Sequence, residues 1–378
     1  MIAALEPVFA NPNHDPTNAG LLRAIMLALP GEQVTLAAPP EHQVAVTEIL
    51  GAEMAAFGRF DIEVMPPGRI CVARIAAQFR EMRQIVHTLR PRALVCLSST
   101  PETFFACRLL SLQVRTVQIV VILHGNLHNA TGWRSRDPRH RLLDSRSSLF
   151  VGRHSPIRFV VLEAAIRDAA VAQGLLPLKQ TDVWPHPVND DEVCLPLRRM
   201  QSGKVRIAFL GAAKRSKGFD RFLALMRRAQ QHDPNGYEFS LIGPMYDEFA
   251  AEAMAGLALT EDMLPRGEYL DRLRRVDYVC MPLQHDTYAL TASASLLDCI
   301  ASVTPLIATR TAAVAHLAAD GPIGFLENDP EALADVVLDH ARLTDHATYE
   351  AFQRNLIHLQ QQRSPAAVAS AVRATLGD

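Results

Sequence analysis

Strand and helix patterns alternate along this chain, and the alternation occurs twice. In the first half, short apolar runs typical of buried strands are separated by segments with helical spacing. The clearest of these helices is predicted within residues 70–91, where Ile75, Phe79 and Met82 share one apolar face. The strands predicted in this half are residues 32–39, 59–66, 92–99, 116–125 and 157–163. Strands that alternate with helices pair into parallel sheets, so this half is predicted to be an α/β domain.

The same alternation restarts after a polar, proline-rich segment that has the composition of a linker. The strands predicted in the second half are residues 205–211, 237–244, 277–283 and 304–310. Two successive arrays of this kind predict two doubly wound domains that face a cleft. We expect an N-terminal Rossmann-like domain over residues 1–188, a linker over 189–203 and a C-terminal Rossmann-like domain over 204–345.

Length and composition limit the classes of function. The 378 residues are enough for two domains, since single cores stop growing near about 250–300 residues. The net charge of -2 offers no bulk positive charge for nucleic acid, so no such partner is expected. The six cysteines form no C-x-x-C pair, the N-terminus lacks the basic region of a signal peptide, and no apolar run reaches about 18 residues. We therefore expect reduced thiols, no membrane-spanning helix and a cytoplasmic location.

Three cations follow the first predicted strand of the second half. Gly211 ends the apolar run, and Lys214, Arg215 and Lys217 come before helical spacing begins at Phe219. Open α/β sheets bind ligands outside the carboxyl ends of their strands, beside helix N-termini. An anion is the expected ligand of this basic turn, and a solvated surface turn is the alternative.

A second anion-binding element is predicted a short distance before the last strands. Thr291, Ser293 and Ser295 are small hydroxyl residues at the entrance of an apolar helix, where free N–H groups point outward. Asp298 lies one turn further on and could accept hydrogen bonds from a ribose. The alternatives are ordinary helix capping for the hydroxyl residues and a helix-dipole partner or surface acid for Asp298.

The first half offers candidate residues for the other side of the cleft. His124 ends an apolar strand and is followed by Gly125 and Asn126, so its ring is expected to project into the cleft. An imidazole there could bind a sugar or assist a hydroxyl acceptor, and a structural histidine is the alternative. Asn18 and Gly20 are expected at a strand-to-helix turn that allows close approach of a ligand, or else in a loop with good capping chemistry.

The order of motifs in the second half resembles the C-terminal half of GT-B glycosyltransferases, especially the retaining family 4. The resemblance starts at the loop that ends in Lys217-Gly218 and continues through "SLIGP", "VDYVCMPL" and the segment from "LLDCIASVTPLIATR" to "GFLENDPEAL". In the first half, "VVILHGNLHN" is similar to the acceptor-side histidine loop of the family, and "VWPHPV" resembles the segment that leads into the linker. The resemblance implies a GT-B fold in which helices of residues 346–378 pack back on the N-terminal domain.

The resemblance also assigns roles to residues. It implies that Gly211 and Lys217 bind the donor diphosphate. Taken with the residue patterns above, we expect Gly211, Lys214, Arg215, Lys217, Thr291, Ser293, Ser295 and Asp298 to bind the donor, and Asn18, Gly20 and Asn126 to lie on the acceptor side. His124 is the expected catalytic residue. The family's pair of acids, with seven residues between them, falls on Leu290 and Asp298, so the first acid is missing. Asp286 is expected to take over part of its role, and the retaining or inverting outcome stays open.

The implied activity is that of a hexosyltransferase. It would move a sugar from a UDP- or GDP-linked donor to a saccharide or lipid-linked acceptor, in cell-surface polysaccharide or glycoconjugate synthesis. A diphosphate leaving group needs positive charge nearby, and the basic turn can supply it. The sequence has no D-x-D element or metal-ligand cluster, so metal independence and no cofactor beyond the donor are expected.

Two alternatives belong to other classes. The first is a GT-B scaffold that has lost catalysis and acts as a binding or assembly partner, which Leu290 favours. The second is a Rossmann dehydrogenase, which "GAAKRSKG" disfavours because it lacks the G-x-G-x-x-G spacing.

Two basic stretches suggest contact with a membrane surface. Arg74, Arg80 and Arg83 lie opposite the apolar face of the first predicted helix, and residues 134–146 are rich in arginine. Many enzymes of the superfamily act on lipid-linked acceptors, so these patches are expected to meet anionic headgroups at the inner face of the membrane. Solvated helix faces are the alternative.

Overall fold

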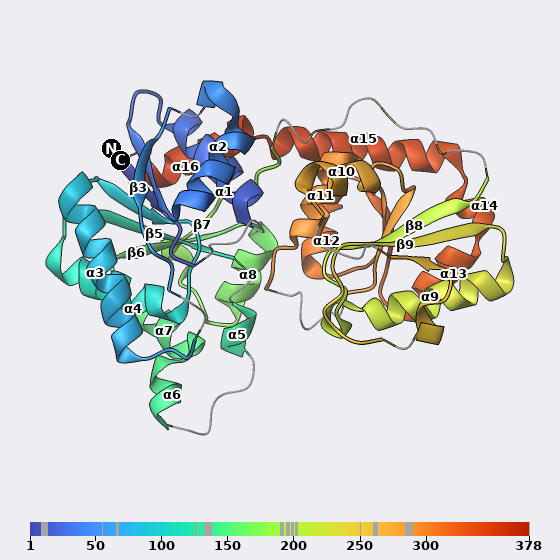
Figure 1. The fold of residues 1–378 in the computed structure, drawn as a ribbon, viewed down its shortest axis with the longest axis horizontal. Coiled ribbons are helices and arrows are strands. Elements are labelled where there is room, and N and C mark those ends of the chain that lie inside the picture. Colours follow the sequence, from blue (N-terminus) through green and yellow to red (C-terminus); the bar gives the residue numbers. More distant parts are fainter. Residues whose placement is uncertain are drawn as a thin grey trace. The chain divides into compact units, whose positions relative to one another are not determined.

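The chain divides into two compact units (Figure 1). The first comprises Met1–Asp191, Leu290–Ala292 and Arg363–Asp378, and the second comprises Glu192–Ala289 and Ser293–Gln362. The computed structural model describes residues 1–8, 14–54, 56–65, 68–124, 127–131, 138–189, 193, 197, 200, 203–249, 251–259, 264–283 and 290–377. Each unit is built on one parallel sheet with helices, which confirms the predicted α/β class.

The first unit contains a sheet of seven parallel strands in the order β3-β2-β1-β4-β5-β6-β7. The strands are β1 (Ile2–Leu5), β2 (Val34–Ala38), β3 (Gly58–Asp61), β4 (Ala93–Cys96), β5 (Gln118–Leu123), β6 (Ile157–Val161) and β7 (Thr181–Val183). Strands β1, β2 and β4 are buried along their whole length, which explains why Thr35 of β2 is the single polar residue among them. The predictions include five of these strands and omit β1 and β7.

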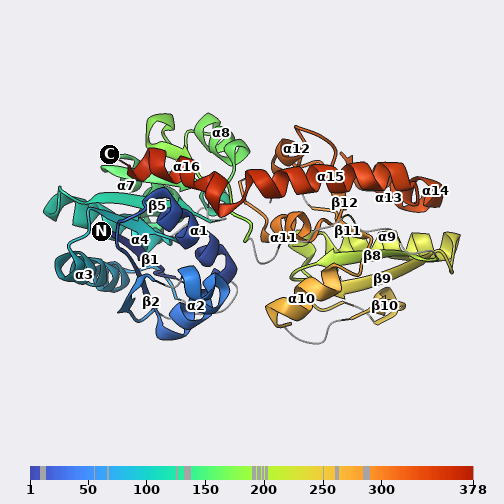
Figure 2. The same ribbon diagram turned by 90° about the horizontal axis from the view of Figure 1, so that it is seen from above.

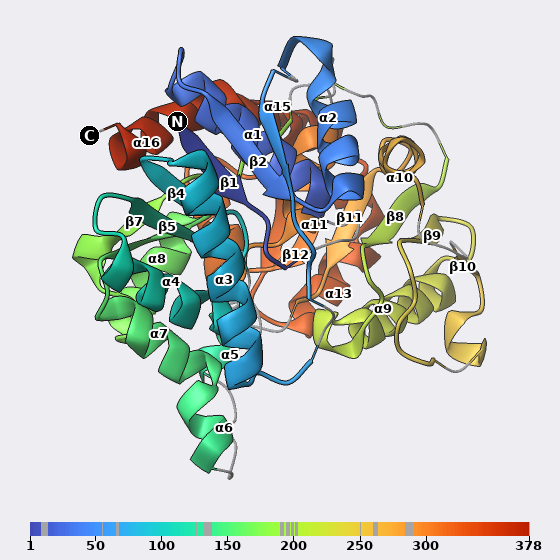
Figure 3. The same cartoon turned by 60° about the vertical axis from the view of Figure 1, so that its left-hand side comes forward.

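Helices flank this sheet. They are α1 (Asp15–Ala28), α2 (Pro40–Met54), α3 (Val72–Leu89), α4 (Pro101–Gln113), α5 (His128–Thr131), α6 (Pro138–Leu143), α7 (Ser145–Arg153), α8 (Ala164–Ala172), the short 3-10 helix η2 (Leu178–Gln180) and α16 (Pro365–Leu376). The helix predicted within residues 70–91 is α3, which packs beside α4 (Figure 3). It ends at Arg90, whose backbone is left-handed with φ of 50°, directly before a proline that cannot continue the helix.

The second unit contains a sheet of six parallel strands in the order β10-β9-β8-β11-β12-β13. The strands are β8 (Val205–Leu210), β9 (Tyr237–Ile242), β10 (Leu257–Ala258), β11 (Tyr278–Met281), β12 (Leu306–Thr309) and β13 (Gly324–Glu327). The predictions include four of them and omit β10, which has only two residues, and β13. Strand β8 lies between β9 and β11, so its carboxyl end is in the middle of the sheet.

Helices also surround the second sheet. They are η4 (Arg215–Lys217), α9 (Phe219–His232), η5 (Ala251–Met254), α10 (Arg266–Leu273), α11 (Ala294–Ser302), α12 (Ala312–Leu317), α13 (Pro330–Leu338), α14 (His340–Leu343) and α15 (His346–Gln362). Helix α9 places Phe219 and Phe222 against Phe209 of β8, with ring centroids 4.9 and 5.5 Å from that ring. This aromatic packing anchors the helix that follows the basic turn.

The two C-terminal helices belong to different units. Gln360 of α15 donates hydrogen bonds from its Nε2 to the carbonyls of Ile300 and Ala301 on α11, at 2.8 and 2.9 Å. Helix α16 packs against α1 in the first unit (Figure 2).

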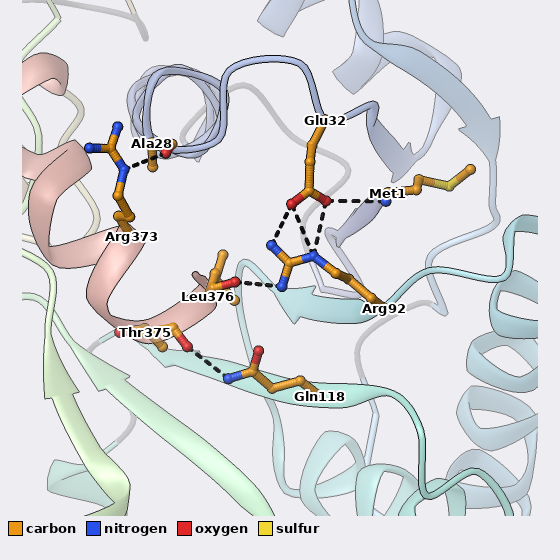
Figure 4. Close-up of polar contacts among 8 residues, drawn as sticks. All are labelled: Met1, Ala28, Glu32, Arg92, Gln118, Arg373, Thr375 and Leu376. Carbon is orange, nitrogen blue, oxygen red and sulfur yellow. Dashed lines mark hydrogen bonds and ion pairs between the residues drawn. The ribbon is translucent and has the colours of Figure 1, made fainter. Parts of the chain in front are cut away.

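Polar contacts fix the end of α16 on the first unit (Figure 4). The Arg92 guanidinium donates to the Leu376 carbonyl and also forms an ion pair with Glu32. Arg373 of α16 donates to the Ala28 carbonyl at 2.8 Å, where α1 ends. The last helix of the chain is therefore an integral layer of this unit. Among the described residues, no helix has both the length and the apolar character that crossing a membrane requires.

Candidate functional site

Glycines shape the loop at the carboxyl end of β8. Gly218 has φ of 79°, and a Cβ atom at this position would lie 2.0 Å from the Pro282 carbonyl oxygen. Gly243, at the end of β9, has φ of 141°, and its Cβ would lie 2.5 Å from the carbonyl oxygen of Gly211. No other residue type fits these two positions without moving the backbone. The loop of residues 211–218 is thus packed tightly against the ends of β9 and β11.

Lys217 lies over the end of β8 in this loop. A Cβ atom added to Gly211 would be 3.6 Å from the Lys217 Nζ and 2.9 Å from the Ser295 Oγ. The lysine is half-buried, and burial lowers its pKa, with nearby Lys214 lowering it further and Asp298 opposing the shift. The structure therefore brings Gly211, Lys217 and Ser295 together around a point with positive charge, which the charge of Asp298 partly opposes.

The other two cations of the turn contact the segment after β9. The Lys214 Nζ lies 4.4 Å from the centroid of the Tyr246 ring, and the Arg215 guanidinium carbon lies 4.7 Å from the centroid of Phe249. The backbone N–H of Arg215 donates to the Asp247 carboxylate at 2.6 Å. The three cations therefore have different surroundings, and Lys217 is the one closest to Gly211 and Ser295 among them.

The N-terminus of α11 forms the other side of this point. Ser293 is the N-cap residue, and within the described chain its side chain makes no capping hydrogen bond. Ser295 is buried, and its hydroxyl donates to the Leu210 carbonyl at 3.4 Å, a long contact. Thr291 groups with the first unit, where its Oγ1 lies 3.5 Å from the His128 Nδ1. The capping alternative is thus not realised by the side chain of Ser293.

Asp298 has partners that the sequence did not indicate. Arg266 donates to its Oδ1 at 2.7 Å, and the Tyr269 hydroxyl donates to its Oδ2 at 2.8 Å. Burial, and then the charge of Asp298, raise the pKa of Tyr269, which remains a hydrogen-bond donor. The two α10 residues are separated from Asp298 by 32 and 29 positions, a distance that no local motif spans. Asp298 is buried and joins α11 to α10, so it is not a surface acid, and its contact with a ribose stays a prediction.

Three histidines gather in the first unit. The ring centroid of His124 lies 5.4 Å from that of His14 and 6.4 Å from that of His186. Burial lowers the pKa of each of the three to about 3, so all are neutral near pH 7. His124 follows the carboxyl end of β5, as expected, and its buried Nε2 has no hydrogen-bond partner among the residues described. Sequence analysis missed His14 and His186.

Asn18 belongs to a different buried network. Its Nδ2 donates to the Glu6 Oε2 at 2.7 Å and lies 3.0 Å from the His42 Nε2. The other ring nitrogen of His42, Nδ1, lies 2.6 Å from the Asp15 Oδ1. The Ser98 hydroxyl donates to the Glu6 carboxylate. Asn18 itself is fully buried. It therefore connects β1, α1 and α2 within the unit.

The expectation that Asn18 and Gly20 lie in a strand-to-helix turn is wrong. Both lie inside α1, which begins at Asp15 with a proline in its first turn. A Cβ atom at Gly20 would be 2.9 Å from the Pro187 side chain and 3.0 Å from the Asn189 Oδ1. The close approach that this glycine permits is to residues 187–189 of the same unit.

Of the other residues singled out in the sequence, the structure describes Leu290 and does not describe Asn126 or Asp286. Leu290, which replaces the first acid of the family pair, is 3% exposed. Across the part of the chain that the structure describes, no three His, Cys, Asp or Glu side chains are arranged to hold a metal ion.

Two doubly wound parallel sheets with a glycine-rich basic loop after the first strand of the second sheet define the GT-B fold. Residues 204–342 match the family described as "Glycosyl transferases group 1". The resemblance to GT-B glycosyltransferases is thereby confirmed, and the narrower assignment to family 4 remains a prediction.

Solved structures with this fold cover nearly the whole chain. HepE of Anabaena in complex with UDP-glucose has a TM-score of 0.69 at 12% identity, with 100% of this chain and 99% of that chain covered. The lipopolysaccharide outer core galactosyltransferase WaaB has a TM-score of 0.67 at 11% identity, covering 100% and 99%. Sucrose-phosphate synthase from Thermosynechococcus elongatus has a TM-score of 0.67 at 14% identity, covering 98% and 96%. No curated protein matches the chain in sequence.

Proposed function

We propose that this protein transfers a sugar from a nucleotide-diphosphate donor to a hydroxyl group of a saccharide or lipid-linked acceptor. The observation that carries the proposal is the position of Lys217 over the glycine end of β8, beside the N-terminus of α11. This point lies within the segment that matches the glycosyltransferase family. In the reaction, the bond between the anomeric carbon and the diphosphate oxygen breaks, and a bond to the acceptor oxygen forms.

Lys217 is suited to stabilise the departing diphosphate. A half-buried ammonium acts in a medium of lower effective dielectric than water, so its attraction for negative charge is strong. Its lowered pKa reflects the cost of burial next to Lys214, and a bound diphosphate would offset that cost. We assign the hydroxyl groups of Ser293 and Ser295, and that of Thr291, to hydrogen bonds with the phosphate oxygens.

The loop cations and the acid of α11 take supporting roles. Lys214 and Arg215 add positive potential from their positions against Tyr246 and Phe249. Asp298 holds Arg266 and Tyr269 of α10, so a ribose hydroxyl would have to share its oxygens with those donors. We propose that Asp298 positions α10 at the donor site and contributes to nucleotide binding through it.

His124 is the candidate catalytic residue on the acceptor side. Its imidazole is neutral, and its Nε2 is a buried acceptor without a partner in the described chain. Such a nitrogen can accept a hydrogen bond from a hydroxyl of the sugar or of the acceptor and so orient it, and the acceptor proton passes to the departing diphosphate. Asn126 and Asp286 retain the acceptor-side and acidic roles that the resemblance implies.

We propose a uridine donor ahead of a guanosine donor, because HepE was solved with UDP and with UDP-glucose. We also propose peripheral contact with the inner face of a membrane. The exposed Leu142 of α6 and Phe150 of α7 support this contact, since Arg141, Arg146 and Arg153 surround them in sequence.

A non-catalytic scaffold is the second candidate. The buried Leu290 favours it, because a buried leucine cannot replace the carboxylate that the family pair places there. A scaffold binds the nucleotide and turns over no donor, whereas an enzyme does both.

Binding and turnover measured together test the proposal. The full chain is titrated with UDP, GDP and NAD, and the release of UDP from UDP-glucose and UDP-galactose is followed with saccharide acceptors. We expect UDP to bind and a UDP-sugar to be consumed. Binding of UDP without consumption of any donor would support the scaffold, and preferential binding of NAD would contradict both candidates.

A further inference from the structure

An open cavity of about 620 Å³ lies at the edge of the first unit. Its walls come from the end of β3 with the residues that follow it and from the middle of α3, including Phe60, Ile62, Met65, Glu63 and Glu81. Strand β3 is the edge strand of its sheet. This volume lies in the range of small-molecule sites, roughly 300–1,000 Å³. None of the roles proposed above for glycosyl transfer uses it.

The charged groups that line the cavity are mostly acidic. Asp61 and Glu63 come from the end of β3, Glu81 comes from α3, and Arg80 is the one cation among the described lining residues. Burial, and then the charge of Glu63, raise the pKa of Glu81 to about 7. Two carboxylates held close together in this way would gain from a positive charge between them.

A buried amide provides a second, independent indication of a ligand. Gln78 lines the cavity and is 2% exposed. Its Nε2 donates to the Thr103 Oγ1 at 3.2 Å, and its Oε1 is buried without a hydrogen-bond partner in the described part of the chain. A buried acceptor of this kind is rare because leaving it unsatisfied costs free energy. A donor group on a ligand would satisfy it.

The remaining wall is apolar. Phe60 and Met65 are half-buried, and Ile62 is 7% exposed. A bare inorganic ion would gain nothing from this surface. Among the described residues, the lining acids included, no three His, Cys, Asp or Glu side chains are arranged to hold a metal ion. The combination fits a positively charged head on a carbon body.

We propose that this cavity binds a ligand with a protonated amine, whose N–H groups donate to Glu63, Glu81 and Gln78 while its carbon body contacts Phe60. An ammonium group supplies three donors, which matches the acceptors in number and in charge. The amine belongs to an amino sugar or to a free aliphatic diamine, and these share the same head group. The inference goes beyond glycosyl transfer and does not depend on it.

Direct binding to the full chain tests the site without any nucleotide donor. Glucosamine is titrated against glucose, which carries a hydroxyl group in place of the amine, and putrescine is titrated separately. We expect at least one amine to bind at least about tenfold more tightly than glucose. Preference for glucosamine assigns an amino sugar, and preference for putrescine assigns a free diamine.

Variants locate the binding in the cavity. Glu81→Gln and Glu63→Gln should each weaken amine binding about tenfold, whereas Glu48→Gln, an exposed acid on α2 away from the lining, should leave it within about twofold. Glu63 is exposed, so its variant tests the site even where replacement of Glu81 disturbs folding. Equal binding of glucose and both amines, or an equal loss in all three variants, would overturn the proposal.

Discussion

The two units differ in the charge of their candidate ligand-binding groups: the second unit has a half-buried cation, and the first unit has neutral histidines. In the second unit, the ammonium of Lys217 is half-buried near Lys214, in a turn whose residues are close together in sequence. In the first unit, three histidines from distant positions are buried in the neutral form. The difference suggests a division of work. The second unit is prepared for an anion, and the first offers uncharged hydrogen-bonding groups.

The largest effect should come from the backbone that shapes the basic loop. Gly218→Ala places a Cβ 2.0 Å from the Pro282 carbonyl oxygen at a φ of 79°. We expect a loss of about 2–4 kcal/mol in the free energy of unfolding, measured by urea denaturation with circular dichroism. Gly31→Ala is the matched control, since its φ is 89° and the described structure has nothing within 4 Å of the added atom. It should cost only the backbone strain, about 1 kcal/mol.

Equal losses in the two alanine variants would mean that the loop relaxes around the added Cβ atom. The close packing of Gly218 against Pro282 would then not be what holds the loop in place.

Removing the charge of Lys217 should separate phosphate binding from base binding. Lys217→Ala is expected to weaken UDP binding by about 1.5–3 kcal/mol and to leave uridine binding unchanged, because only the diphosphate meets the ammonium. Lys214→Ala is the control, since its ammonium lies over the Tyr246 ring. It should cost less than half as much. Calorimetric titration of both variants with both ligands measures the difference, and a parallel loss for uridine would contradict the assignment.

The basic loop between β8 and α9 could be predicted from sequence, because its geometry depends on residues that are neighbours along the chain. A buried run, a glycine, cations and a helical pattern from Phe219 follow in order, and the structure has β8, the turn and α9 there. Parallel strands of four or five apolar residues were predicted for the same reason. Strand β1 was omitted although its run Ile2–Leu5 is apolar and fully buried.

The parts that were missed depend on tertiary structure. His186 follows β7 and His14 precedes α1, and only the strand order brings them near His124. The contact of Asp298 with Arg266 depends in the same way on how α10 packs against α11. No periodicity in a single sequence encodes such pairs, because the positions are joined by folding and not by spacing.

Acid should destabilise the first unit through its neutral histidines. The unfolded chain protonates these rings near their ordinary pKa of 6.5, and the folded chain only near about 3. The unfolded state therefore binds more protons as the pH falls below about 6.5, and stability is lost over that range. The slope should reach at most about 1.4 kcal/mol per pH unit for each histidine.

Tryptophan fluorescence can follow this transition, since Trp184 is fully buried in the first unit. Urea unfolding is compared at pH 7.5 and 5 for the wild type, for His186→Gln and for His87→Gln, which replaces an exposed histidine on α3. The His186 variant should lose less stability on acidification than the other two proteins. Identical pH dependence in all three would show that His186 is not kept neutral by burial.

The smallest expected effect has the opposite sign and comes from the same unit. The folded state raises the pKa of Glu81 from 4.5 to about 7, so the protonated carboxyl is favoured and stability is lost as the pH rises through that interval. Glu81→Gln removes this titration and should be more stable than the wild type at pH 8 by about 1 kcal/mol, after allowance for solvent screening. At pH 4, where both side chains are neutral, the two proteins should have nearly equal free energies of unfolding.

A stabilisation that is the same at both pH values would indicate a packing effect and no buried acid, and it would remove the electrostatic reason for an amine in the cavity. A stabilisation confined to high pH would instead show that burial and Glu63 disfavour the Glu81 carboxylate, which is the charge that the proposed amine would offset.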